Sequence, residues 1–136
     1  MAEDLNGTSN TTHTGGCHCG RIRFEVDAPA VINADECNCS VCQKSGYLHL
    51  HVSRDAFRLL QGDEAIETYT FNTGVAKHHF CRYCGVKSFY IPRSHPHGVS
   101  VNVRCLDPGT IERVDITPFD GRNWEQNVSK LSPISD

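Results

Sequence analysis

Seven of the eight cysteines fall into three short groups, and this arrangement constrains the fold more than any other feature of the chain. The groups are Cys17 and Cys19 in "GCHCG", Cys37, Cys39 and Cys42 in "CNCSVC", and Cys81 and Cys84 in "CRYCG". The N-terminal residues contain no apolar signal segment, so the expected location is the cytoplasm or the nucleus. In such a reducing compartment, clustered cysteines indicate metal binding or catalysis rather than a disulfide framework.

Size and charge exclude several classes of protein. A chain of 136 residues is typical of one domain. Its formal net charge is -3 and its pI is about 6.2, whereas a nucleic-acid module normally needs a basic face. No apolar run approaches the roughly 18–20 residues of a membrane span. We therefore expect neither a nucleic acid nor a membrane as a partner, and the sequence does not predict the oligomeric state.

Alternation of apolar residues predicts a small, mostly antiparallel β protein. We expect residues 1–14 to form a flexible tail, residues 15–127 a zinc domain, and residues 128–136 a C-terminal tail. A short helical turn is expected between Ser53 and Gly62, and "NTGV" is expected to close a hairpin with Gly74 at positive φ. The expected strands are 21–26, 47–52, 66–71, 76–81, 86–91 and 99–103.

The first and last cysteine pairs together make a four-thiolate set, which is the ligand set of a tetrahedral structural zinc site. A glycine follows each pair, at Gly20 and Gly85, and glycine permits the positive φ that a metal-binding turn often needs. A structural zinc contributes ~10–16 kcal/mol in apparent binding free energy. Since a whole domain is stable by only ~5–15 kcal/mol, the metal-free chain is not expected to fold. The alternative is four unrelated buried thiols.

The middle group has three cysteines, and three protein ligands with one exchangeable position are characteristic of a catalytic zinc. We therefore interpret Cys37, Cys39 and Cys42 as an open zinc site. Two alternatives remain at this point. The group can be a redox pair of Cys39 and Cys42, or a closed structural site completed by Cys105, His49 or His51. Otherwise Cys105 is expected to be a buried small side chain, and Trp124 to pack over the core.

Four segments in this order, "GCHCGRIRFEV", "CNCSVC", "HHFCRYCGVKSFYIPRS" and "VNVRCLD", resemble the glutathione-dependent formaldehyde-activating enzyme / centromere protein V family. The resemblance extends from about Gly16 to Trp124. It implies a β-tent fold of stacked antiparallel sheets held by zinc, with two zinc ions per chain. It places a structural zinc on the outer cysteines and a second zinc on the middle group, that is, on Cys17, Cys19, Cys81 and Cys84 and on Cys37, Cys39 and Cys42.

The resemblance also implies an activity, a carbon–sulfur lyase reaction that forms and breaks S-hydroxymethylglutathione from glutathione and formaldehyde. A small thiol, glutathione, is then the expected partner. His49 and His51 are candidates for the proton donor by location, the alternative being a solvated face of their strand. Lys44 and Arg93 are candidates for binding the carboxylates of glutathione. The competing hypothesis is a non-catalytic, zinc-stabilised binding or scaffold module of the centromere protein V type, which "KSFYIPRSHP" and "VRCLD" resemble.

Overall fold

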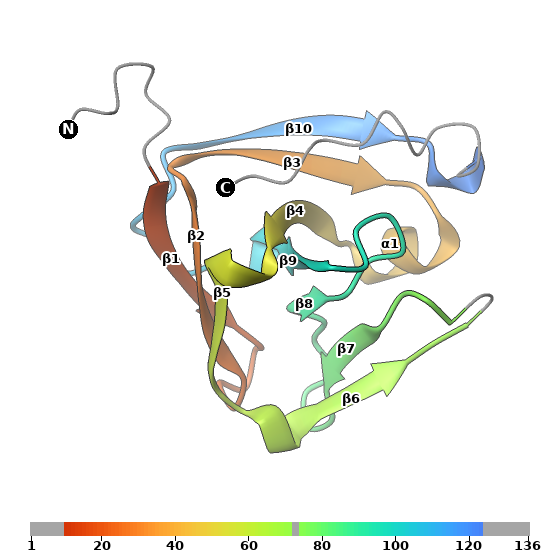
Figure 1. Cartoon of the computed structure of the whole chain (residues 1–136), viewed down its shortest axis with the longest axis horizontal. Coiled ribbons are helices and arrows are strands. Elements are labelled where there is room, and N and C mark those ends of the chain that lie inside the picture. Colours follow the sequence, from red (N-terminus) through yellow and green to blue (C-terminus); the bar gives the residue numbers. More distant parts are fainter. Residues whose placement is uncertain (1–9, 72–73, 124–136) are drawn as a thin grey trace.

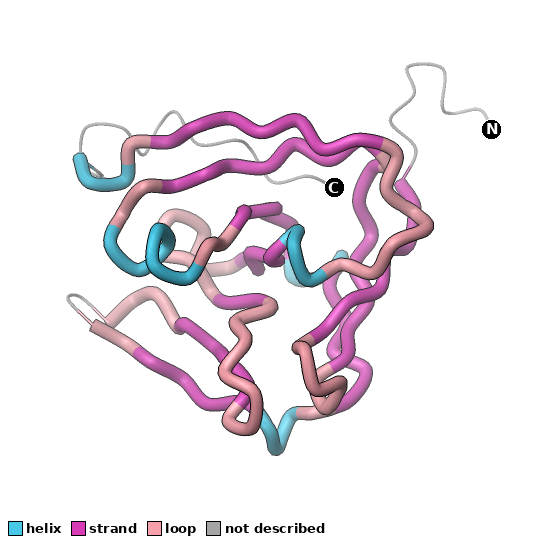
Figure 2. Tube along the Cα trace, turned by 180° about the vertical axis from the view of Figure 1, so that it is seen from behind, coloured by secondary structure: helices cyan, strands magenta, loops and turns pink. Residues whose placement is uncertain are grey.

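The computed structural model describes residues 10–71 and 74–123, and these residues form mostly β structure with one α-helix (Figures 1 and 2). The helix is α1 (Ser40–Ser45). The strands are β1 (Asn10–Gly16), β2 (Arg23–Pro29), β3 (Val31–Cys37), β4 (Leu48–Ser53), β5 (Phe57–Gln61), β6 (Ile66–Tyr69), β7 (His78–Cys81), β8 (Phe89–Tyr90), β9 (Gly98–Asn102) and β10 (Arg113–Phe119). None of the helices in the described residues has the length and apolar character that a bilayer crossing requires.

The strands form three sheets, with the orders β1-β2-β5, β10-β3-β4-β9-β8 and β6-β7. In Figure 1 the first sheet is a wall on the left, β3 and β10 run across the top, and the β6–β7 hairpin closes the bottom. All the pairings are antiparallel except β10 with β3, which is parallel. The expectation of mostly antiparallel β structure is therefore confirmed, with this one parallel pair as an addition.

The core lies between the first two sheets, and the alternation expected at residues 21–26 is confirmed by burial. Ile22, Phe24 and Val26 are buried, as are Leu50 and Val101 on the facing sheet. The ring of Phe24 lies 5.1 Å from that of Phe57 in β5 and 6.0 Å from that of Phe89 in β8. The contact between Phe24 and Phe89 joins the two sheets, since large apolar side chains dominate the free energy of burial.

The expected N-terminal tail is wrong from Asn10 onward, because residues 10–16 form β1 and pair with β2 along its whole length. Polar composition suggested disorder, but the polar side chains have partners within the fold. His13 is fully buried, with Nδ1 2.7 Å from Thr110 Oγ1, and Thr14 donates a hydrogen bond to Asp107 at 2.7 Å. The expectations for residues 1–9, for Trp124 and for the C-terminal tail 128–136 lie outside the described residues.

The helical turn expected at residues 53–62 is also wrong in extent. One 3-10 turn covers Arg54–Ala56, and β5 follows at once. Phe57 pairs with Val26 and Leu59 with Phe24 in β2, so packing against the core favours an extended conformation over a helix. The hairpin is confirmed, with β6 paired to β7 and Gly74 at a φ of 73°.

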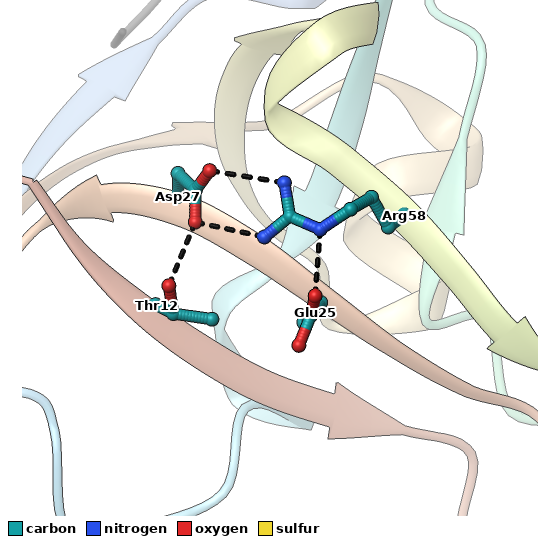
Figure 3. Close-up of polar contacts among 4 residues, drawn as sticks. All are labelled: Thr12, Glu25, Asp27 and Arg58. Atoms are coloured by element: carbon teal, nitrogen blue, oxygen red, sulfur yellow. Dashed lines mark hydrogen bonds and ion pairs between the residues drawn. The ribbon is translucent and has the colours of Figure 1, made fainter.

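An ion-pair network crosses the outer face of the three-stranded sheet (Figure 3). Arg58 in β5 donates to both carboxylate oxygens of Asp27, at 2.9 and 3.0 Å, and to Glu25 at 2.6 Å. Thr12 in β1 donates to Asp27 at 2.9 Å, so the network spans all three strands. The Arg58 guanidinium lowers the pKa of the Asp27 carboxyl below its usual value.

Replacing Arg58 with Met is expected to lower the melting temperature by no more than about 4 °C, because solvent screens an ion pair at this surface. The loss should shrink in 1 M NaCl, which a pair of melting curves at low and high salt would measure. Arg113→Met is the matched control, since Arg113 bonds Asp115 two residues along its own strand. A large loss that salt leaves unchanged would show that Arg58 acts through packing instead.

Candidate functional site

The outer four cysteines lie together, and their spacing fits a tetrahedral metal site. The sulfur atoms of Cys17, Cys19, Cys81 and Cys84 all lie within 4.8 Å of one another. The sulfur of Cys19 is 3.6 Å from that of Cys17 and 3.7 Å from that of Cys81. Thiolates arranged tetrahedrally at a Zn–S distance of 2.3 Å stand about 3.8 Å apart. The group can therefore hold a metal ion, and zinc is the ion that suits four thiolates.

The backbone around this group has the turns that the sequence predicted. Gly20 has a φ of 85° and Gly85 a φ of 79°, so both glycines use the left-handed region. The amide of Ile22 donates to the sulfur of Cys17 at 3.3 Å, and the amide of Gly85 donates to the carbonyl of Cys81 at 2.8 Å. The Ile22 amide, which is directed at sulfur, stabilises the thiolate form that binds metal.

The outer group joins segments that are far apart in the chain, namely the turn between β1 and β2 and the turn after β7. Cys17 and Cys81 are buried while Cys19 is exposed. Hydrogen bonds from Arg21 lower the pKa of Cys19 to about 6, whereas burial raises the pKa of Cys17 to about 11. A cation is therefore needed for all four sulfurs to be ionised at neutral pH.

The middle group also lies together, with the sulfur atoms of Cys37, Cys39 and Cys42 within 4.8 Å of one another. Cys37 ends β3, Cys39 precedes α1 and Cys42 lies within α1. Across residues 10–71 and 74–123, no fourth His, Cys, Asp or Glu ligand joins these three. Cys105, a candidate fourth ligand, instead places its thiol 3.9 Å from the Lys87 carbonyl oxygen. The group is thus a three-sulfur set.

The three thiols share their protons unequally. The pKa of Cys39 is strongly lowered, because the thiols of Cys37 and Cys42 donate hydrogen bonds to its sulfur. For the same reason the pKa of Cys37 rises to about 11, and that of Cys42 is raised further by its thiol neighbours and by burial. Without a cation the group therefore holds one thiolate and two thiols, and binding a divalent cation would release the remaining protons.

Gly121 lies against this group, although no motif in the sequence singles it out. A Cβ atom at position 121 would be 2.3 Å from the sulfur of Cys37 and 3.1 Å from the Cβ of Cys39. The parallel pairing of β10 with β3, which sets Phe119 beside Cys37, brings this glycine into place. Only a residue without a side chain fits there.

His49 and His51 are both buried, so the alternative of a solvated strand face is wrong. His49 Nε2 lies 3.1 Å from the sulfur of Cys42, and Nδ1 lies 3.1 Å from Ser100 Oγ and 3.2 Å from the Tyr90 hydroxyl. Burial lowers the pKa of His49 to about 3, so the ring is neutral. In the thiolate form that binds metal, the Cys42 sulfur can only accept, so Nε2 then carries the ring proton and donates to it, while Nδ1 accepts from a hydroxyl.

His51 has a different environment. Its Nε2 lies 3.5 Å from Asp35 Oδ2, and both side chains are almost completely buried. Neither ring nitrogen makes a hydrogen bond within the described part of the chain, and the contact with Asp35 is an ion-pair distance only. The ring packs 5.6 Å from His49 and 4.5 Å from His95. An imidazole beside a buried carboxylate can accept and return a proton, whereas both nitrogens of His49 are already engaged.

The middle cysteine group opens onto a cleft of about 990 Å³, a volume that suits a small-molecule ligand. His49, His51, Tyr90 and His78 form part of its wall. Its lining also includes three cationic side chains, which are Lys44, Arg93 and Arg122. Lys44 and Arg93 were predicted to bind the carboxylates of glutathione. The structure brings both side chains to the same cleft as the three sulfurs. Arg122 and His78 were not predicted, because they are distant in sequence from the middle cysteines.

Comparison with known proteins agrees with this arrangement. The family model described as glutathione-dependent formaldehyde-activating enzyme matches residues 12–121. A Halomonas elongata protein, named provisionally as a glutathione-dependent formaldehyde-activating enzyme, is 28% identical over 127 residues, which cover 85% of this chain and 81% of that protein.

A solved structure is also similar. It is the crystal structure of a Rhodobacter sphaeroides protein, a structural-genomics target, with a TM-score of 0.66 and 34% identity over 76% of this chain and 99% of that one. The family match covers both cysteine groups and every strand from β2 to β10. The chain therefore belongs to the glutathione-dependent formaldehyde-activating enzyme family.

Proposed function

We propose that this protein is a zinc-dependent carbon–sulfur lyase that forms and breaks S-hydroxymethylglutathione from glutathione and formaldehyde. The observation that carries the proposal is a group of three sulfurs that could hold a metal ion and that faces a ligand-sized cleft, with no fourth ligand side chain among residues 10–71 and 74–123. Family membership supports the same reaction class.

In this proposal each chain holds two zinc ions, a structural one on the outer four cysteines and a second one on Cys37, Cys39 and Cys42. Sulfur donors favour zinc among the common divalent metals, and the sulfur spacing in the outer group fits it. Zinc bound by the middle group would supply a position at which an added thiol is held as its thiolate, the nucleophilic form.

The chain's own residues orient and protonate the reactants. His49 donates to the Cys42 sulfur and fixes that ligand. Attack of the thiolate sulfur on the aldehyde carbon leaves a negative oxygen, which needs the proton that the thiol has lost. His51, paired with Asp35 and lining the cleft, is the residue placed to carry that proton. Holding both reactants side by side is the larger contribution, because thiols already add readily to formaldehyde.

The cationic side chains of the cleft would favour glutathione over simpler thiols. Glutathione carries two carboxylates, and Lys44 and Arg93 are placed along the cleft to bind them. Arg122 donates to the Asn38 carbonyl at 3.0 Å, which anchors its side chain beside the middle cysteine group.

Exchange spectroscopy by NMR tests the proposal, since it measures both directions of the reaction at equilibrium. With glutathione and formaldehyde present, adding the zinc-loaded protein should raise the exchange rate of S-hydroxymethylglutathione above the uncatalysed rate. Chelated protein is the control. An exchange rate that stays at the uncatalysed value would favour the competing hypothesis, a binding or scaffold module.

Gly121→Ala is expected to empty the middle site and leave the outer site filled, because the added methyl group would overlap the Cys37 sulfur. Zinc content should fall from about two ions per chain toward one, as measured by elemental analysis, while the circular dichroism spectrum stays native. Asn123→Ala, in the same turn, is the matched control, since that side chain bonds Asp120 rather than a cysteine. A variant that keeps two zinc ions would contradict this role of the glycine.

A further inference from the structure

His78 in β7 is held rigidly in the wall of the cleft. Its side chain is buried, and the ring is stacked on Tyr90 at 4.9 Å with an interplanar angle of 12°. Phe71 also stacks on it, at 5.4 Å and 21°. The same Tyr90 bonds His49 through its hydroxyl, so the two histidines belong to one packed wall. The sequence does not suggest this, because β7 belongs to a different sheet from β3, which ends at Cys37.

Lys87 determines which nitrogen of His78 carries the proton. Its ammonium nitrogen lies 2.7 Å from His78 Nδ1, and it is packed over the rings of Tyr90 at 3.9 Å and Tyr47 at 4.9 Å. An ammonium group can donate hydrogen bonds but cannot accept them. His78 Nδ1 must therefore accept, which places the ring proton on Nε2.

The charge states of this pair support the assignment. Burial lowers the pKa of Lys87 to about 8, which leaves it mostly protonated at pH 7. Burial and the charge of Lys87 lower the pKa of His78 to about 4, so the imidazole is neutral. A neutral ring whose Nδ1 accepts from Lys87 has one remaining polar group, the Nε2–H donor.

That donor is buried and has no hydrogen-bond partner among the described residues. Buried polar groups without partners are rare in folded proteins. His78 lines the ligand cleft, as does His51, whose ring nitrogens also lack hydrogen bonds among the described residues, so a ligand that enters the cleft is a partner within reach of this wall. His79, the next residue, is different: its Nδ1 lies 2.9 Å from Thr68 Oγ1, and it does not line the cleft.

We propose that His78 Nε2–H is a substrate-contacting donor, which binds the oxygen that formaldehyde contributes to S-hydroxymethylglutathione. This inference rests on the proposed function. When the thiolate sulfur bonds to the aldehyde carbon, the carbonyl π electrons move to oxygen, and a fixed donor stabilises that charge. His78 keeps its proton throughout. The proton released by the thiol ends on the oxygen, so thiol plus aldehyde gives the hydroxymethyl product with no other reactant.

Two substitutions separate the two nitrogens of His78. Asn can replace Nδ1 as an acceptor for Lys87 but does not reach the position of Nε2, whereas Gln can place an N–H near that position. We expect His78→Asn to lower kcat for exchange about tenfold or more with little change in the KM for glutathione, and His78→Gln to keep a substantial part of kcat. His79→Asn is the control and should match the unchanged protein. Equal rates for both His78 variants and the unchanged protein would overturn the proposal.

Nitrogen-15 NMR of the histidine rings in the zinc-loaded protein tests the contact directly and does not depend on turnover. His78 should show the neutral ring with its proton on Nε2. Glutathione alone should leave the Nε2 signal nearly unchanged, and glutathione with formaldehyde should shift it. A proton on Nδ1, or an Nε2 signal that neither addition shifts, would overturn the proposal, as would a full shift with glutathione alone.

This pair of experiments distinguishes the inference from the proposed function. If the unchanged protein does not accelerate exchange, the proposed function fails, and the NMR shift still decides the contact. If it does accelerate exchange while the Asn variant is equally fast, the inference alone fails.

Discussion

Replacing Cys81 with Ser is expected to prevent the chain from reaching a stable fold. Cys81 is fully buried, and its sulfur belongs to the group that joins the turn after β1 to the turn after β7. The apparent binding free energy of a structural zinc, ~10–16 kcal/mol, is as large as the whole stability of a domain. We therefore expect insoluble protein, or soluble protein without a cooperative melting transition.

Cys105→Ser is the matched control for this prediction, because Cys105 lies outside both cysteine groups and its thiol faces a backbone carbonyl, that of Lys87, at 3.9 Å. It should keep both zinc ions and a melting curve close to that of the unchanged protein. Chelation of the unchanged protein should reproduce the loss of folding seen with Cys81→Ser. A native-like melting transition and full zinc content in Cys81→Ser would show that the outer site is not structural.

Replacing Cys39 with Ser is expected to have the opposite pattern, with the fold kept and the activity lost. Cys39 is half-buried and lies at the N-terminal end of α1. Backbone hydrogen bonds that do not involve its sulfur hold β3 and α1 in place. Loss of one of three sulfurs should release the second zinc, leaving about one zinc ion per chain. The exchange rate of S-hydroxymethylglutathione should then fall to that of the uncatalysed reaction.

Zinc analysis, a melting curve and NMR exchange on the same preparation check this prediction. Ser40→Ala is its control, because it changes a neighbouring hydroxyl in the same segment without removing a sulfur. If Cys39→Ser exchanged the adduct as fast as the unchanged protein, the middle cysteines would not form the active site.

The cysteine groups could be predicted from sequence because spacing limits where a thiol can lie. Within each short segment the chain can barely separate Cys17 from Cys19 or Cys81 from Cys84, and the glycines at 20 and 85 predicted the turns. The structure gathers the two groups of sulfur atoms that the spacing indicated. Zinc in those groups stays a prediction.

The parts that sequence did not predict depend on contacts between distant segments. β3 and β10 carry polar residues at many positions, so neither has a clear alternating pattern, and their parallel pairing becomes visible only in three dimensions. β1 looked like a tail for the same reason. Both faces of β4 are covered, which buries His49 and His51, although alternation along one strand suggests that one face meets water.

The cleft illustrates the same limit at the level of chemistry. His78 and Lys87 are nine residues apart, and no motif joins them to Cys37 or to Gly121. The roles proposed for them depend on the stacking of the His78 ring on Tyr90 and on the hydrogen bond from Lys87 to His78 Nδ1. Such relations are set by packing of the three sheets, which the sequence pattern does not specify.

The central claim is that the middle cysteine group is an open metal site whose fourth position accepts an added thiol. Cobalt substitution tests it, because the visible spectrum of cobalt reports its ligand set. Adding glutathione to the cobalt-loaded protein should shift and strengthen the sulfur-to-cobalt band as a fourth thiolate binds, and Cys39→Ser should abolish this response while the spectrum of the outer site persists. A spectrum that millimolar glutathione leaves unchanged would contradict the claim.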